Sequence, residues 1–509
     1  MARIRGVILT ETGRARLVAC LDKLMSSETI SKVSAPELED YCKSKVHYLS
    51  ASTINRILAG KPVDQSSCRT FFLAMDLSLE PSDWEYAEQE RIETEEPSEA
   101  PLTIANNTPP IGIASEIKDR DWGRLDPYLS STFRTLVERK TSEFVGRQYI
   151  FDAIDNFLTT NPCGYISIKA KPGVGKSTIL AEYVRRTNCI AHFNLRPDGI
   201  ARADQFLESI CVQLIGRYGV NSNLPLPPGA TEDGRFLNHL LEQAAQRAPE
   251  SPVVIAIDAL DEVNLASQSS GANVLYLPQY LPDNVYVLLT QRSDVPLPFH
   301  VFVPHKIIDL MGSEYTARSS QDIELYIRTQ SERRSIQHWL YLQALDKEDF
   351  ITQLSLKSEL NFMYLFYVLG DIEQGRYKDF SIQDLPSGLE NYYETHWQLM
   401  GMNAQPLPRS KIKIVYVLAT IEQAVSADHI SRIAGDDVLT VQEVLTHDFG
   451  QFLLIQNIEN ELCYSVYHSS FSDFLYRKDI VQAAGVMLED ILLQITNSLW
   501  EGVYGDEQL

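Results

Sequence analysis

The chain has 509 residues, of which 44% are hydrophobic, and its formal net charge is −23. This length allows about three domains with sizeable cores, while the acidic balance excludes a protein that coats nucleic acid over its whole surface. The 7 cysteines are scattered without metal-binding spacing, which favours free thiols. No stretch reaches the ~18 apolar residues of a membrane span, and the first residues lack the apolar run of a signal peptide. We therefore expect a cytoplasmic protein without membrane contact.

Residues 1–87 are predicted to form a small all-α domain. Their hydrophobic residues recur at helical spacing, and this apolar pattern comprises Leu17, Leu21, Leu24, Leu38, Tyr41, Cys42, Phe71, Phe72, Met75 and Leu79. The segment Ser50–Leu58 begins with good N-cap residues and stops just before Gly60, as a short helix does. Several short helices with a tight turn resemble a helix-turn-helix domain, in which Ser50–Leu58 is the recognition helix.

The same domain is locally basic within an acidic chain. Between Arg3 and Arg69, eleven Lys and Arg residues stand against seven Asp and Glu residues. Arg56 and Lys61 are candidates for contacts with phosphates, and Asn55 is a candidate for contact with a base edge. Small helical domains also serve protein contacts, so the sequence leaves both DNA and protein open as partners of residues 1–87.

Residues 88–112 differ in composition from the segments on both sides. Acidic residues and prolines dominate Arg91–Pro101, and Asn106–Pro110 reads Asn-Asn-Thr-Pro-Pro. A segment of this composition buries too little apolar surface to form a core. We therefore expect a flexible, partly extended linker over residues 88–112.

The segment from Gly164 to Arg185 predicts a strand, a glycine turn and a helix in that order. Ile166 and Ile168 alternate as in a strand, and the apolar residues of Ile179–Val184 show helical spacing. The turn holds the core of a P-loop motif, formed by Pro172, Gly173, Val174, Gly175, Lys176, Ser177 and Thr178. Ala170 stands where the usual motif has its first glycine, a position at which alanine requires a negative φ.

These residue types suit the binding of ATP or ADP with Mg²⁺. Glycines let backbone N–H groups curl around crowded anionic phosphates, and the N-terminus of the following helix adds about half a positive charge. Lys176 is predicted to reach the β- and γ-phosphates, and the Ser177 hydroxyl to complete the Mg²⁺ coordination shell.

The rest of residues 113–310 alternates between strands and helices. Four further apolar segments are predicted as strands, at 190–193, 253–258, 285–290 and 305–310. Near-continuous apolar strands separated by helices indicate a parallel sheet covered on both faces. The sequence therefore predicts an α/β fold, with a P-loop NTPase domain over residues 113–310.

Polar residues at the ends of two of these strands are candidates for catalysis. Asp258 ends a buried strand and is predicted to hold Mg²⁺ directly or through water. Asp261 or Glu262 is predicted to orient and polarise the attacking water. Arg292 follows the next strand and either stabilises the γ-phosphate or is a surface arginine at a strand end.

The C-terminal half is predicted to be mostly helical. Residues 311–405 form a helical domain, in which Asp322–Tyr326 starts one helix. Residues 406–476 form a winged-helix domain, and residues 477–509 a helix with an acidic tail. The winged-helix pattern consists of helices at 412–421, near Ile430 and at 438–445, followed by a hairpin at 452–455 and 463–467. His468 closes this hairpin.

Residues 144–475 resemble a NACHT-type member of the STAND class of signal-transducing ATPases. The stretches KPGVGKST, VVIAIDALDE and VYVLLTQR carry the resemblance, together with LPSGLENYYETHW and VYHSSFSDFL. Val145, Gly146 and Arg147 are similar to the segment that wraps the adenine base in many P-loop ATPases. Ser358–Asn361 stands where relatives often carry a Gly-Pro element.

The resemblance implies a switch that is closed with ADP and that opens and forms homo-oligomers with ATP. It implies that His468 contacts the β-phosphate of bound ADP and locks the winged helix down. Three functions remain open: an ATP/ADP switch in bacterial signalling or antiviral defence, with an unknown trigger or effector protein; an ATP-controlled DNA-binding transcription regulator; and an AAA-like ATPase that loads onto DNA.

Overall fold

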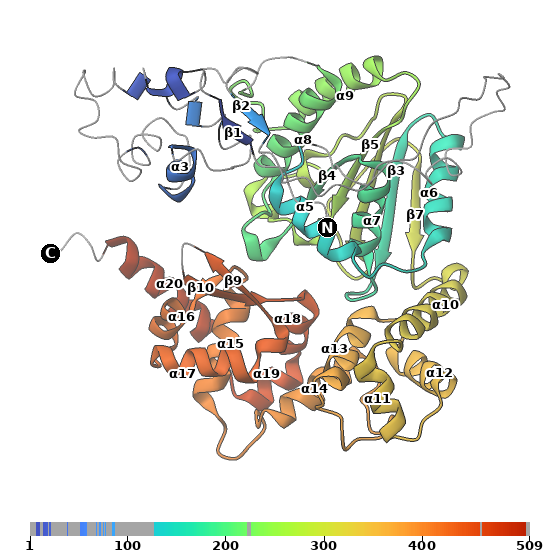
Figure 1. Cartoon of the computed structure of the whole chain (residues 1–509), viewed down its shortest axis with the longest axis vertical. Helices are drawn as coiled ribbons and strands as arrows, with labels where there is room; N and C mark the ends of the chain where they lie inside the picture. Colours follow the sequence, from blue (N-terminus) through green and yellow to red (C-terminus); the bar gives the residue numbers. More distant parts are fainter. Residues whose placement is uncertain are drawn as a thin grey trace, which may run out of the picture. The chain divides into compact units, whose positions relative to one another are not determined.

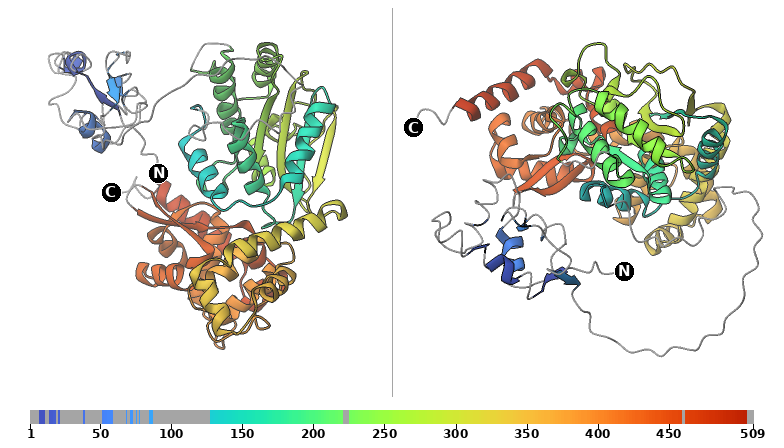
Figure 2. Two further views of the ribbon diagram at one scale, coloured as in Figure 1. Left: turned by 45° about the vertical axis from the view of Figure 1, so that its right-hand side comes forward. Right: turned by 90° about the horizontal axis from the view of Figure 1, so that it is seen from above.

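The computed structural model describes residues 7–10, 14–18, 20–21, 38, 51–58, 68, 71–72, 75, 77, 84–86, 127–220, 225–458 and 461–504. The chain divides into two units, Met1–Pro109 and Pro110–Leu509. Figures 1 and 2 show the elements of each unit. The predicted linker over residues 88–112 lies outside the described residues.

The N-terminal unit contains a small hydrophobic core and a short sheet. The core residues are Leu9, Leu17, Leu21, Leu38, Ile54, Ile57, Cys68, Phe71, Phe72 and Met75. Helix α3 (Ala51–Leu58) agrees with the predicted recognition helix. Strands β1 (Val7–Leu9) and β2 (Trp84–Tyr86) pair antiparallel, so the expectation of an entirely helical domain needs correction. The pattern of helical spacing gave no signal for them because each strand has only 3 residues.

The predicted DNA contacts of this unit are described only in part. Arg56 lies on α3 and is exposed. The side chain of Asn55 and the whole of Lys61 lie outside the described residues.

A five-stranded parallel sheet forms the first half of the second unit, which confirms the predicted α/β fold. Its strands are β3 (Gly164–Ala170), β4 (Ile190–Phe193), β5 (Val253–Asp258), β6 (Val285–Arg292) and β7 (His305–Asp309). Their order across the sheet is β4-β5-β6-β3-β7, and each pair is parallel. Strand β6 therefore lies between the strand that leads into the P-loop and the strand that ends in Asp258 (Figure 1).

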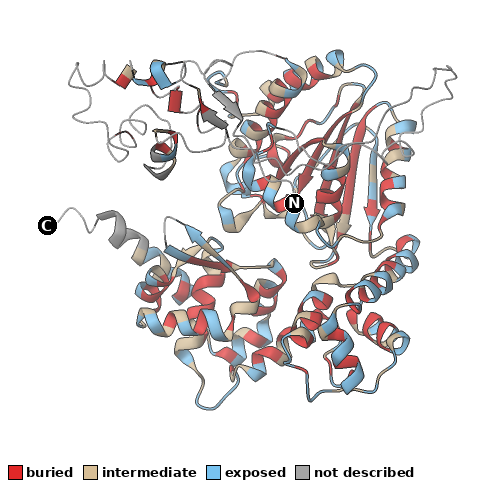
Figure 3. Cartoon of the chain, viewed as in Figure 1, coloured by how far each residue is buried: buried red, intermediate tan, exposed pale blue. Residues whose placement is uncertain are grey.

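Helices cover both faces of this sheet, which explains why the strands are apolar throughout. On β5, Val254 and Ala256 pack in one hydrophobic cluster with α5 (Ser131–Thr141), α6 (Gln148–Thr160) and α7 (Lys176–Thr187). Val253, Ile255 and Ile257 of the same strand pack in a second cluster with α8 (Ala203–Tyr218) and α9 (Arg235–Arg247). Successive side chains of a strand point to opposite faces, so both sets must be apolar. Figure 3 shows the burial that results along the central strands.

The second half of this unit is helical and ends in a short sheet. The helices are α10 (Ser313–Gln330), α11 (Arg334–Leu342), α12 (Lys347–Ser358), α13 (Phe362–Glu373), α14 (Gly388–Leu399), α15 (Arg409–Ile421), α16 (Ala427–Ala434), α17 (Val438–Glu443), α18 (Ser469–Leu475), α19 (Lys478–Ala484) and α20 (Leu488–Tyr504). Strands β8 (Val425–Ser426), β9 (Leu453–Ile458) and β10 (Glu461–Val466) form an antiparallel sheet in the order β8-β10-β9. One hydrophobic cluster runs from Ile323 to Ile491 and joins these helices.

Two predictions for this region differ in outcome. The three helices and the hairpin predicted between residues 406 and 476 are present in the expected order, as α15, α16, α17, β9 and β10. The helix predicted to start at Asp322 begins earlier, at Ser313. Its first turns read Ser-Glu-Tyr-Thr-Ala-Arg-Ser-Ser and bury only Tyr315 and Ser319, so they lack the apolar stripe that marks an amphipathic helix.

Candidate functional site

The P-loop joins β3 to α7 with the backbone geometry that the glycines allow. Gly173 and Gly175 have φ values of +80° and +100°, a region that residues with a Cβ rarely adopt. Ala170 is the last residue of β3 and is fully buried. Its φ is not positive, so alanine fits here without strain.

Lys176 lies at the start of α7 and points across the loop. Its ammonium group donates to the carbonyl oxygens of Ala170 and Lys171, at 3.0 Å each. Burial lowers the pKa of Lys176, and the nearby carboxylates of Asp261 and Asp258 partly oppose this effect. The loop therefore places the lysine beside the acidic strand ends, as a phosphate-binding lysine requires.

Asp258 is buried at the end of β5, and its environment suits a magnesium ion. Its Oδ1 accepts a hydrogen bond from the Thr290 hydroxyl at 2.5 Å, and the same hydroxyl accepts from the N–H of Ala259 at 2.8 Å. Its Oδ2 receives no hydrogen bond from the described residues. Mg²⁺ in phosphate sites takes only one or two protein oxygens, with phosphates and waters as the other ligands. The Asp258 carboxylate and the Ser177 hydroxyl therefore fit such an ion.

The two acids after Asp258 differ in their partners. Asp261 accepts a hydrogen bond from the backbone N–H of Arg292 at 2.9 Å. Among the described residues, the Glu262 carboxylate accepts only a long hydrogen bond, 3.4 Å, from the N–H of Arg196. Burial, followed by the charges of Asp261 and Asp258, raises the pKa of Glu262 to about 7. A carboxylate with this pKa is matched to proton transfer near neutral pH.

Arg292 connects the end of β6 to helix α18. Its guanidinium donates to both carboxylate oxygens of Asp473, at 3.0 and 2.8 Å, and also pairs with Asp294 at 2.8 Å. Hydrogen bonds from Arg292 to these two carboxylates raise its pKa above the ordinary value. The side chain is only 17% exposed, so it is not a free surface arginine.

His468 lies two residues after β10 and caps the N-terminus of α18. Its Nδ1 accepts a hydrogen bond from the N–H of Ser470 at 3.3 Å and lies 2.7 Å from the Ser470 hydroxyl. Burial, followed by the charges of Lys140, Lys176 and Arg292, lowers the pKa of His468 to about 3. The ring is therefore neutral, and because Nδ1 accepts, its proton lies on Nε2.

The segment Val145–Arg147 ties the P-loop to the helices beyond the sheet. Arg147 is buried, and its guanidinium donates to the carbonyl of Val174 at 2.9 Å and to the Ser319 hydroxyl at 3.0 Å. Its backbone N–H donates to Asp322 at 3.2 Å. A role for this segment in adenine binding stays a prediction.

The loop before α13 holds the outer side of the P-loop. The N–H groups of Phe362 and Met363 both donate to the carbonyl of Gly173, at 3.0 and 3.1 Å. The Asn361 amide donates to the carbonyl of Pro172 at 3.1 Å. These contacts, which the sequence did not predict, join the P-loop to the side-chain amide of Asn361 and to the backbone of Phe362 and Met363, rather than to a Gly-Pro element.

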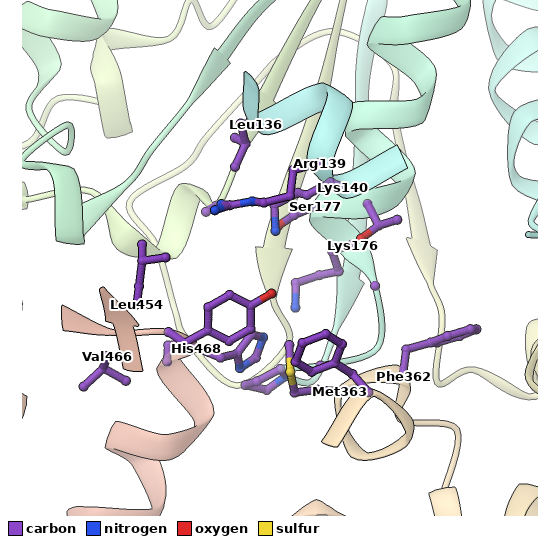
Figure 4. Close-up of a pocket in the computed structure, with 18 of the residues that line it drawn as sticks. Leu136, Arg139, Lys140, Lys176, Ser177, Phe362, Met363, Leu454, Val466 and His468 are labelled. Carbon is purple, nitrogen blue, oxygen red and sulfur yellow. The ribbon is translucent and has the colours of Figure 1, made fainter. Parts of the chain in front are cut away.

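A cavity of about 1490 Å³ joins these parts into one site. Of the residues predicted from sequence, those that line it are Val145, Arg147, Pro172, Gly173, Val174, Gly175, Lys176, Ser177, Thr178, Asp258, Asp261, Glu262, Arg292 and His468. Gly146 is the exception. Figure 4 shows the labelled side chains of Lys176, Ser177 and His468 around this cavity.

The cavity also has lining residues that the sequence reading missed. Arg139 and Lys140 come from α5, and Asp473 comes from α18. For α5 a signal was present, because Ser130 caps the helix and its apolar residues Phe133, Leu136 and Val137 recur at helical spacing. No local pattern marks Asp473, because its partner Arg292 lies 181 positions away.

Two features are absent from the described residues. None of their helices has the length and hydropathy that crossing a bilayer requires. They also contain no group of three His, Cys, Asp or Glu side chains arranged around a metal ion. The magnesium site inferred above needs no such group, since phosphates and waters supply most of its ligands.

The sheet, the glycine loop and the acidic strand ends define a P-loop nucleotide-binding domain of the α/β class. No family model matches the sequence, and the comparison with curated proteins found no match. A Signal Transduction ATPase with Numerous Domains (STAND) from Pyrococcus horikoshii, which has a tetratricopeptide repeat sensor, is similar over 70% of this chain and 45% of its own, with 13% identity and a TM-score of 0.34. The chain thus spans less than half the length of that protein.

Two other solved structures are similar over most of their own length. The RuvB Holliday junction branch migration motor of Thermotoga maritima is matched over 67% of this chain and 99% of its own, with 12% identity and a TM-score of 0.27. A chain of Drosophila ORC bound to DNA is matched over 69% and 98%, with 14% identity and a TM-score of 0.26. Because identities and TM-scores are this low, only the residues of this chain itself bear on its function.

The contact between Gly146 and Asp322 predicts a large loss of stability for Gly146→Ala. Gly146 has a φ of +70°, and an added Cβ would lie 2.0 Å from Asp322 Oδ1. Gly199 is a matched control, because its φ is +69° and an added Cβ there meets no atom within 4 Å. We expect Gly199→Ala to lower the free energy of unfolding by about 1 kcal/mol through backbone strain, and Gly146→Ala by about 3 kcal/mol. Urea denaturation of both variants measures the difference, and equal losses would contradict the close contact.

Proposed function

We propose that this protein is an ATP/ADP-dependent molecular switch of the NACHT/STAND type, which hydrolyses ATP slowly and forms homo-oligomers when activated. The observation that carries the proposal is the composition of the cavity wall. Lys176, Ser177 and Asp258 come from the sheet domain, whereas His468 and Asp473 come from the segment after β10. A nucleotide in this cavity therefore touches both parts, and its phosphates decide whether they stay together.

The hydrolytic roles follow from the contacts of each side chain. Lys176 binds the β- and γ-phosphates, and Ser177 with Asp258 holds Mg²⁺, which neutralises charge on the phosphates. Glu262 is the better candidate for the base that activates water, because an oxygen of Asp261 is already engaged by the N–H of Arg292. Its pKa of about 7 supports the same role.

The switching role follows from Arg292 and His468. With Asp473 as its partner, Arg292 holds α18 against the end of β6. A γ-phosphate offers the same guanidinium a more highly charged partner, so ATP competes with Asp473 for it. His468 has a donor at Nε2, which suits the β-phosphate of ADP in the closed arrangement.

Other polar contacts hold the same two parts of the chain together. Arg196 pairs with Glu422 at 3.0 Å, and the N–H of Ala424 donates to the carbonyl of Pro197 at 3.0 Å. An exposed ion pair such as Arg196–Glu422 contributes little free energy to the closed arrangement. A small difference in free energy between two nucleotide states is therefore sufficient to separate the parts. A role in bacterial signalling or antiviral defence is consistent with such a switch.

The first test concerns nucleotide binding. Lys176→Ala removes the cation that faces the phosphates, and we expect the affinity for ATP to fall about 100-fold. A fluorescence titration with a labelled ATP analogue measures the affinity. Lys171→Ala, which removes an exposed cation from the same loop, is the matched control and should retain affinity. Unchanged ATP binding by Lys176→Ala would contradict the nucleotide site.

The second test uses the pH dependence of hydrolysis. Glu262 acts as a base only when ionised, and with a pKa of about 7 its ionised fraction rises about tenfold from pH 6 to pH 8. The charged groups that act on it are Asp258, Asp261, Arg196 and Lys140. We expect kcat/KM for ATP, which reports the free enzyme, to rise by about the same factor over this interval.

Glu262→Gln is the control for that profile. It should hydrolyse ATP much more slowly and lose the rise between pH 6 and pH 8. A variant that keeps the wild-type profile would assign the base to Asp261.

The third test concerns assembly. Asp473→Asn weakens the partner of Arg292, so we expect it to form oligomers with ADP, whereas the wild type does so only with a non-hydrolysable ATP analogue. Light scattering after size-exclusion chromatography measures the mass. Asp479→Asn, which weakens an exposed ion pair with Arg477 outside the cavity wall, is the control and should behave as the wild type. Identical masses with both nucleotides, together with rapid steady turnover, would favour an AAA-like motor instead.

A further inference from the structure

Two cationic side chains in the cavity wall make no hydrogen bond or ion pair with the part of the chain that the structure describes. Arg139 and Lys140 occupy the last turn of α5 and line the cavity. Figure 4 shows both side chains beside Ser177, at the side of the cavity that faces Lys176. Neither side chain makes a hydrogen bond or an ion pair with any residue in the described parts of the chain.

Arg139 and Lys140 differ in this respect from other cations of the cavity wall. The other arginines of the cavity wall discussed above, Arg147, Arg196 and Arg292, all have acceptors at hydrogen-bond distance. Lys140 is half-buried, and burial lowers its pKa, as does the charge of Arg139 beside it. Arg139 is exposed, so water solvates its charge, whereas the partial burial of Lys140 costs free energy that a bound anion would offset.

The helix dipole alone does not explain their position. Basic residues in the last turn of a helix are stabilised by its dipole wherever their side chains point. That effect gives no reason for both side chains to line the cavity. A bound anion explains why they line it, because the anion would interact directly with the charged groups at the cavity wall.

The neighbours of Lys140 indicate which part of a ligand it meets. The carboxylates that act on its charge are Asp258 and Glu262, and Lys140 is the first of the cations that act on His468. All four residues line the same cavity as the P-loop. The Asp258 and Glu262 carboxylates are also where Mg²⁺ and the attacking water are required.

We infer that Lys140, with Arg139 beside it, binds the terminal phosphate of a nucleoside triphosphate as a further cationic group in addition to Lys176 and Arg292. The inference rests on the proposed nucleotide site and deepens it, since it assigns part of the selection of triphosphate over diphosphate to helix α5. The γ-phosphate carries the charge that a diphosphate lacks at this place, and an ammonium group binds phosphate as a point charge.

The test compares two nucleotides on the full-length chain. Calorimetric titrations with ADP and with a non-hydrolysable ATP analogue are made on the wild type and on Lys140→Gln. We expect the affinity for the ATP analogue to fall about tenfold and the affinity for ADP to change little. Glu138→Gln, on the same helix but outside the cavity wall, is the matched control and should bind both nucleotides as the wild type does.

The unfolding temperature distinguishes a loss of binding from a loss of structural stability. Without nucleotide, Lys140→Gln should unfold at the wild-type temperature or above it, because it removes a half-buried unpaired charge. Equal loss of affinity for both nucleotides, no loss at all, or a lower unfolding temperature without ligand would each overturn the inference. If Lys140→Gln does not fold, Arg139→Gln and Lys140→Arg replace it. The first must lower the preference for the ATP analogue and the second must keep it, and any other result overturns the inference.

The same titrations distinguish this inference from the proposed function. If the wild type binds neither nucleotide, or if Lys176→Ala binds both as well as the wild type does, the nucleotide site itself is wrong. If Lys176→Ala loses both nucleotides while Lys140→Gln matches the Glu138→Gln control, only the role of α5 is wrong.

Discussion

The site depends on the insertion of β6 between β3 and β5. Parallel pairing aligns the carboxyl ends of these strands, and the register sets Ala170 opposite Arg292 and Ile257 opposite Leu289. The P-loop, the Thr290–Arg292 segment and Asp258 must therefore emerge side by side at one edge of the sheet. The Thr290 hydroxyl then fixes Asp258, and the Asp261 carboxylate fixes the backbone of Arg292. The position of each chemical group thus follows from a backbone constraint that apolar packing on both faces maintains.

The sequence predicted those parts of the structure whose signal is local. The strands from Gly164 to Asp309, the glycine turn and helix α3 each carry their pattern within a few residues. The replacement of the first glycine of the P-loop motif by Ala170 is also compatible with the structure, since a strand end tolerates alanine. Helix α5 was missed although its cap and apolar spacing were present, and the early start of α10 was missed because its first turns are polar.

The contacts that complete the site were not predictable in the same way. Asn361 reaches Pro172 across 189 positions of sequence, and Arg292 reaches Asp473 across 181. No periodicity or spacing relates such residues, because tertiary packing of separate elements brings them together. The role of Lys140 was equally unpredictable, since the helical pattern around it places it on the polar side of α5 but does not show that this side lines a cavity.

The charges of the cavity give the coupling between ligand and shape a physical basis. The acidic side chain of Asp473 balances Arg292 and thereby connects α18 to the sheet. Lys176 rests on two carbonyl oxygens, and Arg139 and Lys140 have no partner among the described residues. In the switch proposed above, a triphosphate would supply negative charge to all of these cations, and would compete with Asp473 while it satisfies the others. A diphosphate would satisfy fewer of them and would leave the Arg292–Asp473 pair intact. The two nucleotides therefore differ in the protein contact they replace, which is the differential interaction that any ligand-driven switch requires.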